Sequence, residues 1–297
     1  MMDAVIANPL AGRGKVHKKL EEVKKILNDL DLDYEIYQTE KPGQAIDFAK
    51  KVLDSGKYKR IIILGGDGTI NEVIQPLVGS DIQILPIPLG TGNDFVKFFY
   101  PYMKYDTILQ QKGHSFDSKA VDVGLVEYGK SKRYFINGMG IGFDAEVLNR
   151  MKGIKLLKGD FLYTTAVLWT FLSFKGIEVE VVTKEKLSPF RGKFLLFNVG
   201  NGSYLGGGFK LFPKAKVDDG FLDVSLIETV SPLRFFTNFY KAFKGKHLAL
   251  REVHYFKTTG IHLISRKPLS IQLDGELIKD VDELKISILK RSLQVII

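Results

Sequence analysis

Residues 61–72, Ile-Ile-Ile-Leu-Gly-Gly-Asp-Gly-Thr-Ile-Asn-Glu, join a continuous apolar run to a glycine-rich turn. The run Ile61–Leu64 is typical of a central parallel strand that is covered on both faces. The glycines after it allow the backbone to approach an anion closely, and a helix that begins there points free N–H groups at the anion. Asp67 adds a carboxylate, as expected where a cation bridges it to the anion. The alternative is a structural turn in which Asp67 or Thr69 caps the helix, but three glycines exceed what a cap needs.

Two familiar glycine motifs do not fit this turn. A dinucleotide-binding fingerprint needs a further glycine where Ile70 and Asn71 stand. A P-loop needs Gly-Lys followed by Ser or Thr, and the nearest match, residues 12–16, lacks both the hydroxyl and the spacing. The turn at 65–68 therefore indicates a different phosphate-binding arrangement.

Two more turns of this kind follow expected strands, at residues 86–95 (Pro-Ile-Pro-Leu-Gly-Thr-Gly-Asn-Asp-Phe) and at residues 8–12 (Asn-Pro-Leu-Ala-Gly). The carboxyl ends of parallel strands form the usual ligand crevice of an α/β sheet. We therefore expect the three turns to form one binding site.

Strand-like and helix-like segments alternate in the first part of the chain and give way to strand-like runs after it. The expected strands are 3–7, 34–37, 61–64 and 82–87, and the expected helices are 15–30, 44–53 and 69–78. From residue 120 onward the strand-like runs are 120–126, 134–138, 177–182, 194–199, 222–226, 261–264, 270–273 and 284–289. This pattern predicts a doubly wound parallel α/β domain over residues 1–119 and a β-sandwich domain over residues 120–297, with a barrel as the alternative for the latter.

The net charge and the cysteine content of the chain limit the classes of ligand and partner that it can bind. The 297 residues include 43 Lys and Arg against 34 Asp and Glu, a net charge of +9, and no cysteine. The absence of cysteine excludes disulfides, thiolate metal sites and a cysteine nucleophile, and it fits a reducing compartment. The positive charge favours a phosphorylated ligand or an acidic membrane surface. No nucleic-acid-binding module accompanies it, so we expect no nucleic acid partner.

The most apolar segment, residues 161–174, is too short and too rich in Thr and Ser to span a bilayer. We expect a core helix here, with Trp169 in the core or at an interface. The alternative is an amphipathic helix that lies on a membrane. The N-terminus shows no signal-peptide pattern, so we expect a cytoplasmic protein, with peripheral contact at the inner face of the membrane left open.

With these motifs in place, the sequence resembles the diacylglycerol kinase catalytic-domain family, specifically the soluble bacterial lipid kinases. The resemblance covers nearly the whole chain and rests on these segments: Asn8–Gly12, Gly65–Val73, Gly90–Phe95, Asp218–Gly220 and Leu273–Glu276. Related chains often end in a further helix that packs on the first domain, and residues 293–297 leave little room for one.

The resemblance implies roles for individual residues. ATP would be held by Asn8, Pro9, Leu10, Ala11, Gly12, Thr39, Gly65, Gly66, Asp67, Gly68, Thr69, Ile70, Asn71 and Thr91, with Glu72 supporting the loop. Asp67 and Asp94 would reach a catalytic Mg²⁺ through water. Asp274 and Glu276 would complete the active site, with Asp274 as base and Glu276 linked to magnesium, or the reverse. A structural divalent ion would bind the Lys216 carbonyl, the Asp219 side chain and the Phe221 carbonyl.

The chemistry of phosphoryl transfer is consistent with these roles, since it needs positioned phosphates, a metal ion and a carboxylate that orients or deprotonates the acceptor. From the residues alone, Asp274–Glu276 is equally well a hairpin turn with two exposed acids, and Asp218–Gly220 is also a typical turn. We expect an ATP- and Mg²⁺-dependent kinase of a lipid hydroxyl, most simply that of diacylglycerol or a related lipid. An NAD kinase-like enzyme and a non-catalytic lipid- or nucleotide-binding module are the alternatives, and a homodimer is left open.

Overall fold

The computed structural model describes residues 2–153, 159–185 and 189–297, which form two compact units. Unit 1 comprises Met1–Val123, Val217–Asp219 and Leu289–Ile297, and unit 2 comprises Gly124–Lys216 and Gly220–Ile288. The sequence predicts one domain boundary, between residues 119 and 120. In the structure, two later segments, Val217–Asp219 and Leu289–Ile297, also belong to unit 1. The last of these segments does so through strand pairing, described next.

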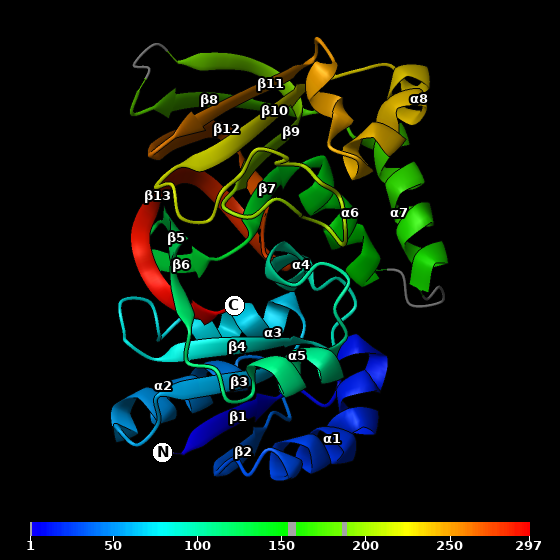
Figure 1. The fold of residues 1–297 in the computed structure, drawn as a ribbon. Coiled ribbons are helices and arrows are strands. Elements are labelled where there is room, and N and C mark those ends of the chain that lie inside the picture. The colour runs from blue at the N-terminus through cyan, green and yellow to red at the C-terminus, as the bar shows by residue number, and fades with distance from the viewer. Residues whose placement is uncertain (1, 154–158, 186–188) are drawn as a thin grey trace. The chain divides into compact units, whose positions relative to one another are not determined.

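Unit 1 is built on a parallel sheet with the strand order β2-β1-β3-β4 (Figure 1). Its strands are β1 (Asp3–Ala7), β2 (Tyr34–Gln38), β3 (Arg60–Gly65) and β4 (Gln83–Pro88). Every residue of β1 and β3 is buried, which explains why both strands are apolar apart from Asp3 and Arg60. The end of β13 (Glu276–Ile296) pairs in parallel with β4, with Gln294 opposite Gln83 and Val295 opposite Ile84. This pairing ties the C-terminal residues to unit 1.

The helices of unit 1 are α1 (Ala11–Asp29), α2 (Gln44–Ser55), α3 (Asp67–Ile74), α4 (Asp94–Phe99) and α5 (Tyr105–Lys112). Helix α1 contacts α5, and α2 contacts α3. With this strand order, right-handed crossovers place α1 on one face of the sheet and α2 and α3 on the other. The first turn of α1 is irregular, because Gly12, Arg13 and Gly14 all have left-handed φ angles of 60°, 61° and 82°. The regular helix therefore begins at Lys15, as the sequence predicts.

A buried ion pair lies in the sheet of unit 1. Arg60 of β3 is fully buried, and its guanidinium group donates to the carboxylate of Asp3 in β1, with an Nε–Oδ1 distance of 3.0 Å. The same group donates to the carbonyl oxygen of Ser115 at 3.0 Å. Since both charges are removed from water, the pair depends on having both of its members.

Replacing Arg60 by Ala is expected to lower the free energy of unfolding by about 3 kcal/mol, because it leaves the Asp3 carboxylate buried and unpaired. Urea unfolding followed by circular dichroism measures the change. The double variant Asp3→Leu/Arg60→Met is the control, since removal of both charges should recover most of the loss. A loss below about 1 kcal/mol for Arg60→Ala would contradict this interpretation of the pair.

Unit 2 is dominated by antiparallel strands. They are β6 (Ser131–Phe135), β7 (Gly138–Gly142), β8 (Ile177–Thr183), β9 (Phe190–Gly200), β10 (Leu222–Glu228), β11 (Val253–Thr258) and β12 (Gly260–Leu273), together with the parts of β5 (Ser118–Tyr128) and β13 that lie within the unit. Two long strands, β9 and β12, each pair with both β7 and β8, so the pairing closes into a ring. The sequence predicts a sandwich, with a barrel as the alternative. The structure agrees with each in part, because the strands are antiparallel and four of them pair in a closed ring.

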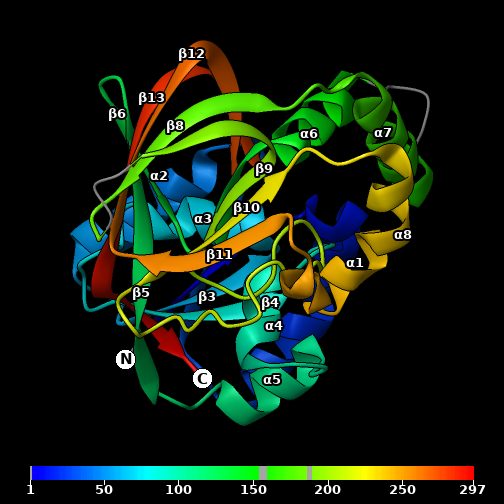
Figure 2. The same ribbon diagram turned by 90° about the horizontal axis from the view of Figure 1, so that it is seen from above.

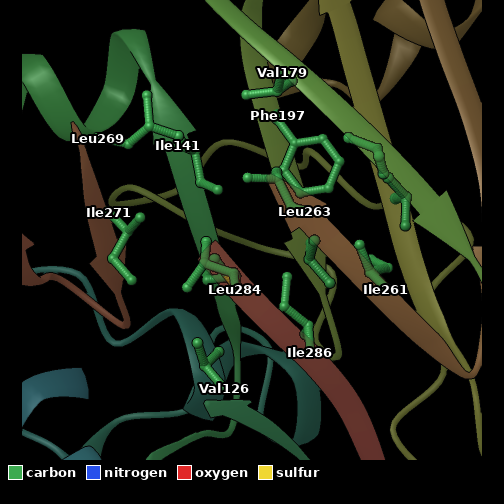
Figure 3. Close-up of a cluster of buried hydrophobic side chains, with 14 of the residues drawn as sticks. Val126, Ile141, Val179, Phe197, Ile261, Leu263, Leu269, Ile271, Leu284 and Ile286 are labelled. Atoms are coloured by element: carbon green, nitrogen blue, oxygen red, sulfur yellow. The ribbon is translucent and has the colours of Figure 1, made fainter. Parts of the chain in front are cut away.

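Buried aliphatic and aromatic side chains fill the interior of these strands. Figure 3 shows part of this core, in which Ile141, Phe197, Leu263, Ile271 and Leu284 come from the four strands β7, β9, β12 and β13. Each of the five is almost completely removed from water. The alternation of buried and exposed residues along β8 is typical of a strand with one face on a core.

In the described part of unit 2, three helices and a 3-10 turn accompany the strands, more than the sequence predicts. They are α6 (Phe143–Gly153), α7 (Gly159–Ser173), α8 (Pro232–Phe243) and η1 (Lys246–Ala249). Helices α7 and α8 lie side by side (Figure 2), and the Phe171 and Phe235 rings stack with their centroids 4.3 Å apart. Of the two places predicted for Trp169, the core is wrong, because its side chain is 55% exposed, and an interface stays a prediction. Within the described residues, no helix has the length and apolar character needed to cross a membrane.

Candidate functional site

Three loops meet at the carboxyl ends of β1, β3 and β4 in unit 1, as the sequence predicts. They span residues 8–12, 65–71 and 89–94. The Asn8 side chain donates from Nδ2 to Thr69 Oγ1 at 3.1 Å and thereby links the first loop to the second. The Leu89 N–H donates to the Gly65 carbonyl at 3.1 Å and links the third loop to the second. The three turns therefore form one continuous backbone surface.

Close backbone approach explains two of the glycines. A Cβ atom on Gly66 would lie 2.9 Å from Gly90 Cα, and a Cβ on Gly90 would overlap Gly66 Cα. Gly68 differs, because a Cβ there would meet nothing within 4 Å and the residue is exposed. Packing within the chain thus gives no reason for glycine at position 68, whereas a ligand that lies against this backbone would.

Gly90→Ala and Gly68→Ala separate these two roles. We expect Gly90→Ala to lower the free energy of unfolding by about 2 kcal/mol, because the added methyl group forces two loops apart. Gly68→Ala should leave stability within about 0.5 kcal/mol of the wild type, since its methyl group enters open space. Thermal unfolding of both variants checks the pair. Equal losses would show that position 68 is constrained by the fold itself.

Two of the four predicted catalytic acids belong to unit 1. Asp67 opens α3, and its Oδ1 accepts from the Phe95 N–H at 3.0 Å, so this carboxylate lies at the first turn of α4. Asp94 is 3% exposed, and its carboxylate lies 3.3 Å from Lys97 Nζ. Asp67 is only half-buried, which makes it the more accessible of the two acids.

The residues predicted to hold ATP differ in their contacts and in their exposure. The Glu72 carboxylate accepts from the N–H groups of Gly43 at 3.0 Å and Ala45 at 3.3 Å. Glu72 therefore joins α3, the helix that follows the glycine turn, to the start of α2. Ile70 is 1% exposed and Asn71 is 3% exposed, and the Asn71 Oδ1 accepts from Gln75. The other predicted residues are half-buried or exposed, apart from Gly65, Thr69 and Thr39, which are buried.

The other two predicted acids lie in unit 2, on the hairpin between β12 and β13. Asp274 and Gly275 have φ angles of 45° and 90°, as in the tight turns that favour Asp-Gly. Asp274 is 5% exposed, which differs from the exposed acid of the simple hairpin alternative. Its carboxylate accepts from three successive N–H groups, of Ile136, Asn137 and Gly138, at 2.8, 3.1 and 2.8 Å.

Glu276 has the opposite environment. Its side chain is 50% exposed and forms an ion pair with Arg133 of β6. Arg133 was not among the residues predicted from the sequence, because 143 positions separate it from Glu276 and no local pattern joins them. Of the two hairpin acids, Glu276 is the one that presents its carboxylate to solvent.

A second buried acid, Asp144 of α6, is connected to the hairpin by hydrogen bonds and was not predicted from the sequence. Gln272 Nε2 donates to Asp144 Oδ2 at 3.1 Å, and the Gly275 N–H donates to Gln272 Oε1 at 3.1 Å. The side chain of Gln272 therefore connects Asp144 to the turn that carries Asp274. Burial raises the pKa of Asp144 to about 6, and hydrogen bonds from Gln272 and from the backbone oppose the shift.

This raised pKa predicts a pH dependence of stability. Between pH of about 4 and about 6 the folded state holds a proton on Asp144 that the unfolded state has lost, so stability falls as the pH rises through this window. The contribution is about 3 kcal/mol. Asp144→Asn should remove it, which makes the variant more stable than the wild type at pH 8. Urea unfolding of both proteins across this range measures the difference, and parallel curves would refute the assignment.

The turn predicted to bind a structural cation contains Lys216, Asp219 and Phe221 and is closed by Gly220, which has a φ angle of 75°. Its neighbour Asp218 pairs with Lys119, with Oδ2 and Nζ 2.8 Å apart. Among the parts of the chain that the structure describes, no three His, Cys, Asp or Glu side chains gather as a metal cluster. The predicted ligand set has one carboxylate and two carbonyl groups, so this site stays a prediction.

The fold and its loops define a class: a protein with a parallel α/β unit that carries three converging glycine turns, and a second unit of antiparallel strands. Residues 4–126 match the model of the diacylglycerol kinase catalytic domain, and residues 138–297 match that of the YegS C-terminal NAD kinase beta sandwich-like domain. The chain belongs to the family of proteins that combine these two domains, a diacylglycerol kinase catalytic domain followed by a YegS C-terminal domain.

Individual proteins agree with this placement. The chain is 28% identical to "Diacylglycerol kinase" of Staphylococcus carnosus, over 92% of this chain and 87% of the relative. It is also 28% identical to "Putative lipid kinase YtlR" of Bacillus subtilis, over 92% of each chain. A crystal structure of a diacylglycerol kinase from Bacillus anthracis shares the fold, with a TM-score of 0.70 and 23% identity over 99% of this chain and 96% of that chain. The two sequence similarities support a kinase of the lipid kinase family, and the structural similarity supports the fold.

Proposed function

We propose that this protein transfers the γ-phosphoryl group of ATP, in the presence of Mg²⁺, to a hydroxyl group of diacylglycerol or a related lipid. The observation that carries the proposal is the loop cluster of unit 1, in which Gly68 has an open face beside the carboxylate of Asp67. Phosphoryl transfer depends mainly on positioning and electrostatic stabilisation, and such a cluster can supply both. The family relationship supports a lipid as the acceptor.

The nucleotide phosphates would lie against the loops 8–12 and 65–69. The exposed backbone at Gly68 and the N–H groups of the first turn of α3 offer hydrogen-bond donors to phosphate oxygens. Asp67 is suited to hold Mg²⁺ through water, with Asp94 behind it. The bound ion would supply charge neutralisation of the phosphates, and the residues of the chain would fix their position.

The environments of the two hairpin acids favour Glu276 as the base. Both oxygens of Asp274 already accept backbone hydrogen bonds, and the residue is buried, so its carboxylate is suited to holding the hairpin in place. Glu276 is exposed, and Arg133 orients its carboxylate. We therefore assign proton removal from the lipid hydroxyl to Glu276 and a positioning role to Asp274, the reverse of the preference drawn from the family resemblance.

The second candidate is an NAD kinase-like enzyme, because the model that matches residues 138–297 is described as NAD kinase beta sandwich-like. Its acceptor would be a soluble dinucleotide rather than a lipid. A non-catalytic module that binds lipid or nucleotide would keep the fold of both units and would give no product. The three functions differ in the molecule that carries the γ-phosphate of ATP afterwards: a lipid, a dinucleotide, or ATP itself when no transfer occurs.

The test incubates the protein with ATP labelled at the γ-phosphate, Mg²⁺, and either a total lipid extract or NAD. We expect label in the organic phase, and mass spectrometry of that phase names the phosphorylated lipid. Label in NADP would favour the second candidate. Binding of ATP without labelled product in either reaction would favour the non-catalytic module.

A further inference from the structure

Helices α7 and α8 of unit 2 expose large apolar side chains. The residues are Leu168, Trp169 and Leu172 of α7 and Leu233, Phe236 and Tyr240 of α8, which are between 43% and 80% exposed. We call these six residues the α7–α8 surface. Exposed apolar residues that gather in one place mark a contact surface more often than a solvated one.

The geometry of α8 places its part of this surface on one stripe. Leu233, Phe236 and Tyr240 are three and four residues apart, so they share a helix face. A different face packs inward, because Phe235 and Phe239 contact buried clusters of unit 2. The apolar stripe is therefore additional to what the fold needs for packing.

Helix α7 continues the same surface. The ring centroid of Phe171 lies 5.4 Å from that of Phe236, and it lies 4.3 Å from that of Phe235. Leu168 and Leu172 are one helical turn apart on α7, and Leu172 is 80% exposed. Figure 2 shows α7 and α8 next to each other on this side of unit 2. The surface thus extends over two helices.

Basic residues outnumber acidic residues around the surface. Residues 161–177 and 229–251 contain no Asp or Glu, and the second segment contains Lys241, Lys244 and Lys246. Its two arginines, Arg234 and Arg251, both pair with Glu252. The Arg150 guanidinium group lies 5.0 Å from the ring of Trp169 and pairs with the Glu146 carboxylate. Basic residues beside exposed Trp, Tyr and Leu side chains are the composition of a segment that lies in the interface of an anionic membrane.

We propose that the α7–α8 surface docks this protein onto an anionic lipid bilayer. Its leucine and aromatic side chains enter the boundary between headgroups and acyl chains, and Lys241 and Lys244 contact lipid phosphates. The proposal rests on the proposed function, because a lipid acceptor has to be reached at a bilayer. A second copy of the chain fits less well, since a two-fold contact would bring two positively charged faces together.

The binding test is sedimentation with vesicles of phosphatidylcholine, alone or mixed with phosphatidylglycerol. We expect the wild type to prefer the anionic vesicles and to lose binding as salt rises. Leu172→Ser/Leu233→Ser should weaken binding about tenfold, because it removes apolar area that the bilayer would bury. Lys241→Glu/Lys244→Glu should weaken binding to anionic vesicles at least about twentyfold, since each lysine contributes about fivefold.

Matched controls lie on exposed positions of the strands of unit 2. Ile264 is 48% exposed on β12, and Lys285 is exposed on β13. Ile264→Ser and Lys285→Glu remove an apolar or basic side chain of the same kind away from α7 and α8, and they should bind vesicles as the wild type does. Unchanged binding by both surface variants, or an equal loss in the controls, would overturn the proposal.

Two further measurements separate this proposal from the function on which it rests. Kinase activity is measured with a short-chain diacylglycerol in solution and with a long-chain diacylglycerol in vesicles. The surface variants should lose activity only with the vesicles. If neither lipid is phosphorylated by the wild type while vesicle binding still follows the variants, the proposed function fails and the docking surface stands. If ultracentrifugation shows a dimer that Leu172→Ser/Leu233→Ser dissociates while vesicle binding stays unchanged, the surface joins two copies and the proposal is wrong.

Discussion

Replacing Glu276 by Gln is expected to lower kcat for lipid phosphorylation about a thousandfold, within the range that general bases contribute. Gln is nearly isosteric and can still accept from Arg133, so the hairpin should keep its geometry. It cannot take a proton from the lipid hydroxyl at neutral pH. Initial rates at saturating ATP, with the KM for ATP measured in parallel, check the prediction, since the KM should change little.

The matched control is Arg133→Gln, which removes the partner of Glu276 and keeps the carboxylate. We expect a loss of about tenfold, because the carboxylate loses its orientation but not its basicity. If both variants lose the same activity, Glu276 matters only through the ion pair. A Glu276→Gln variant with near-normal kcat would refute the assignment of the base.

Replacing Asp274 by Ala is expected to lower the free energy of unfolding by about 4 kcal/mol. The substitution leaves the N–H groups of residues 136–138 without their acceptor, and each buried N–H that loses its partner costs about 1–3 kcal/mol. Ala is also less suited than Asp to a left-handed φ angle of 45°. Urea unfolding of the full chain measures the loss.

Asp274→Asn gives an intermediate case, because its amide oxygen can replace Oδ1, which accepts from Asn137 and Gly138, but its NH₂ group would face the Ile136 N–H. We expect a loss of about 2 kcal/mol. Asp282→Ala, at an exposed position of β13, is the control and should change stability by less than about 0.5 kcal/mol. If Asp274→Ala unfolds like the control, the three hydrogen bonds do not hold the hairpin.

Much of unit 1 could be predicted from sequence because its local signals agree. The run at residues 3–7 is apolar and ends at Asn8-Pro9, and β1 spans Asp3–Ala7 as predicted. The glycine turns were placed correctly at the ends of their strands, since a parallel sheet requires its loops to converge there. The pairing of the chain's end with β4 was not predicted, because 211 positions separate Gln83 from Gln294 and the register has no local sequence signal.

Unit 2 is harder to predict because the apolar residues of several of its helices and strands do not recur at a clear helical or strand spacing. The sequence of α8, Pro-Leu-Arg-Phe-Phe-Thr-Asn-Phe-Tyr-Lys-Ala-Phe, has apolar residues on more than one face, since one face packs and another is exposed. The predicted strand 284–289 is a part of β13, whose 21 residues include charged side chains on its solvent face. Only the apolar positions of one face carry a strand signal, so the charged positions of the other face hide the full length of the strand.

The sequence also predicts the candidate site only in part. The sequence motifs predict four acids for the site, Asp67, Asp94, Asp274 and Glu276, but they do not distinguish a buried acid from an exposed one. The burial of Asp274 depends on the backbone of residues 136–138, which lies on another strand connection and carries no motif of its own. Asp144 was missed for a similar reason, because its link to the hairpin runs through the side chain of Gln272.

The central claim is tested most directly by following the labelled γ-phosphate of ATP into diacylglycerol in mixed micelles with Mg²⁺. The assay compares the wild type with Asp67→Asn and Glu276→Gln, which change one acid in each unit. We predict labelled phosphatidate from the wild type and a loss of about a thousandfold in both variants. An absence of lipid product from the wild type, or product formed at the wild-type rate by either variant, would contradict the account.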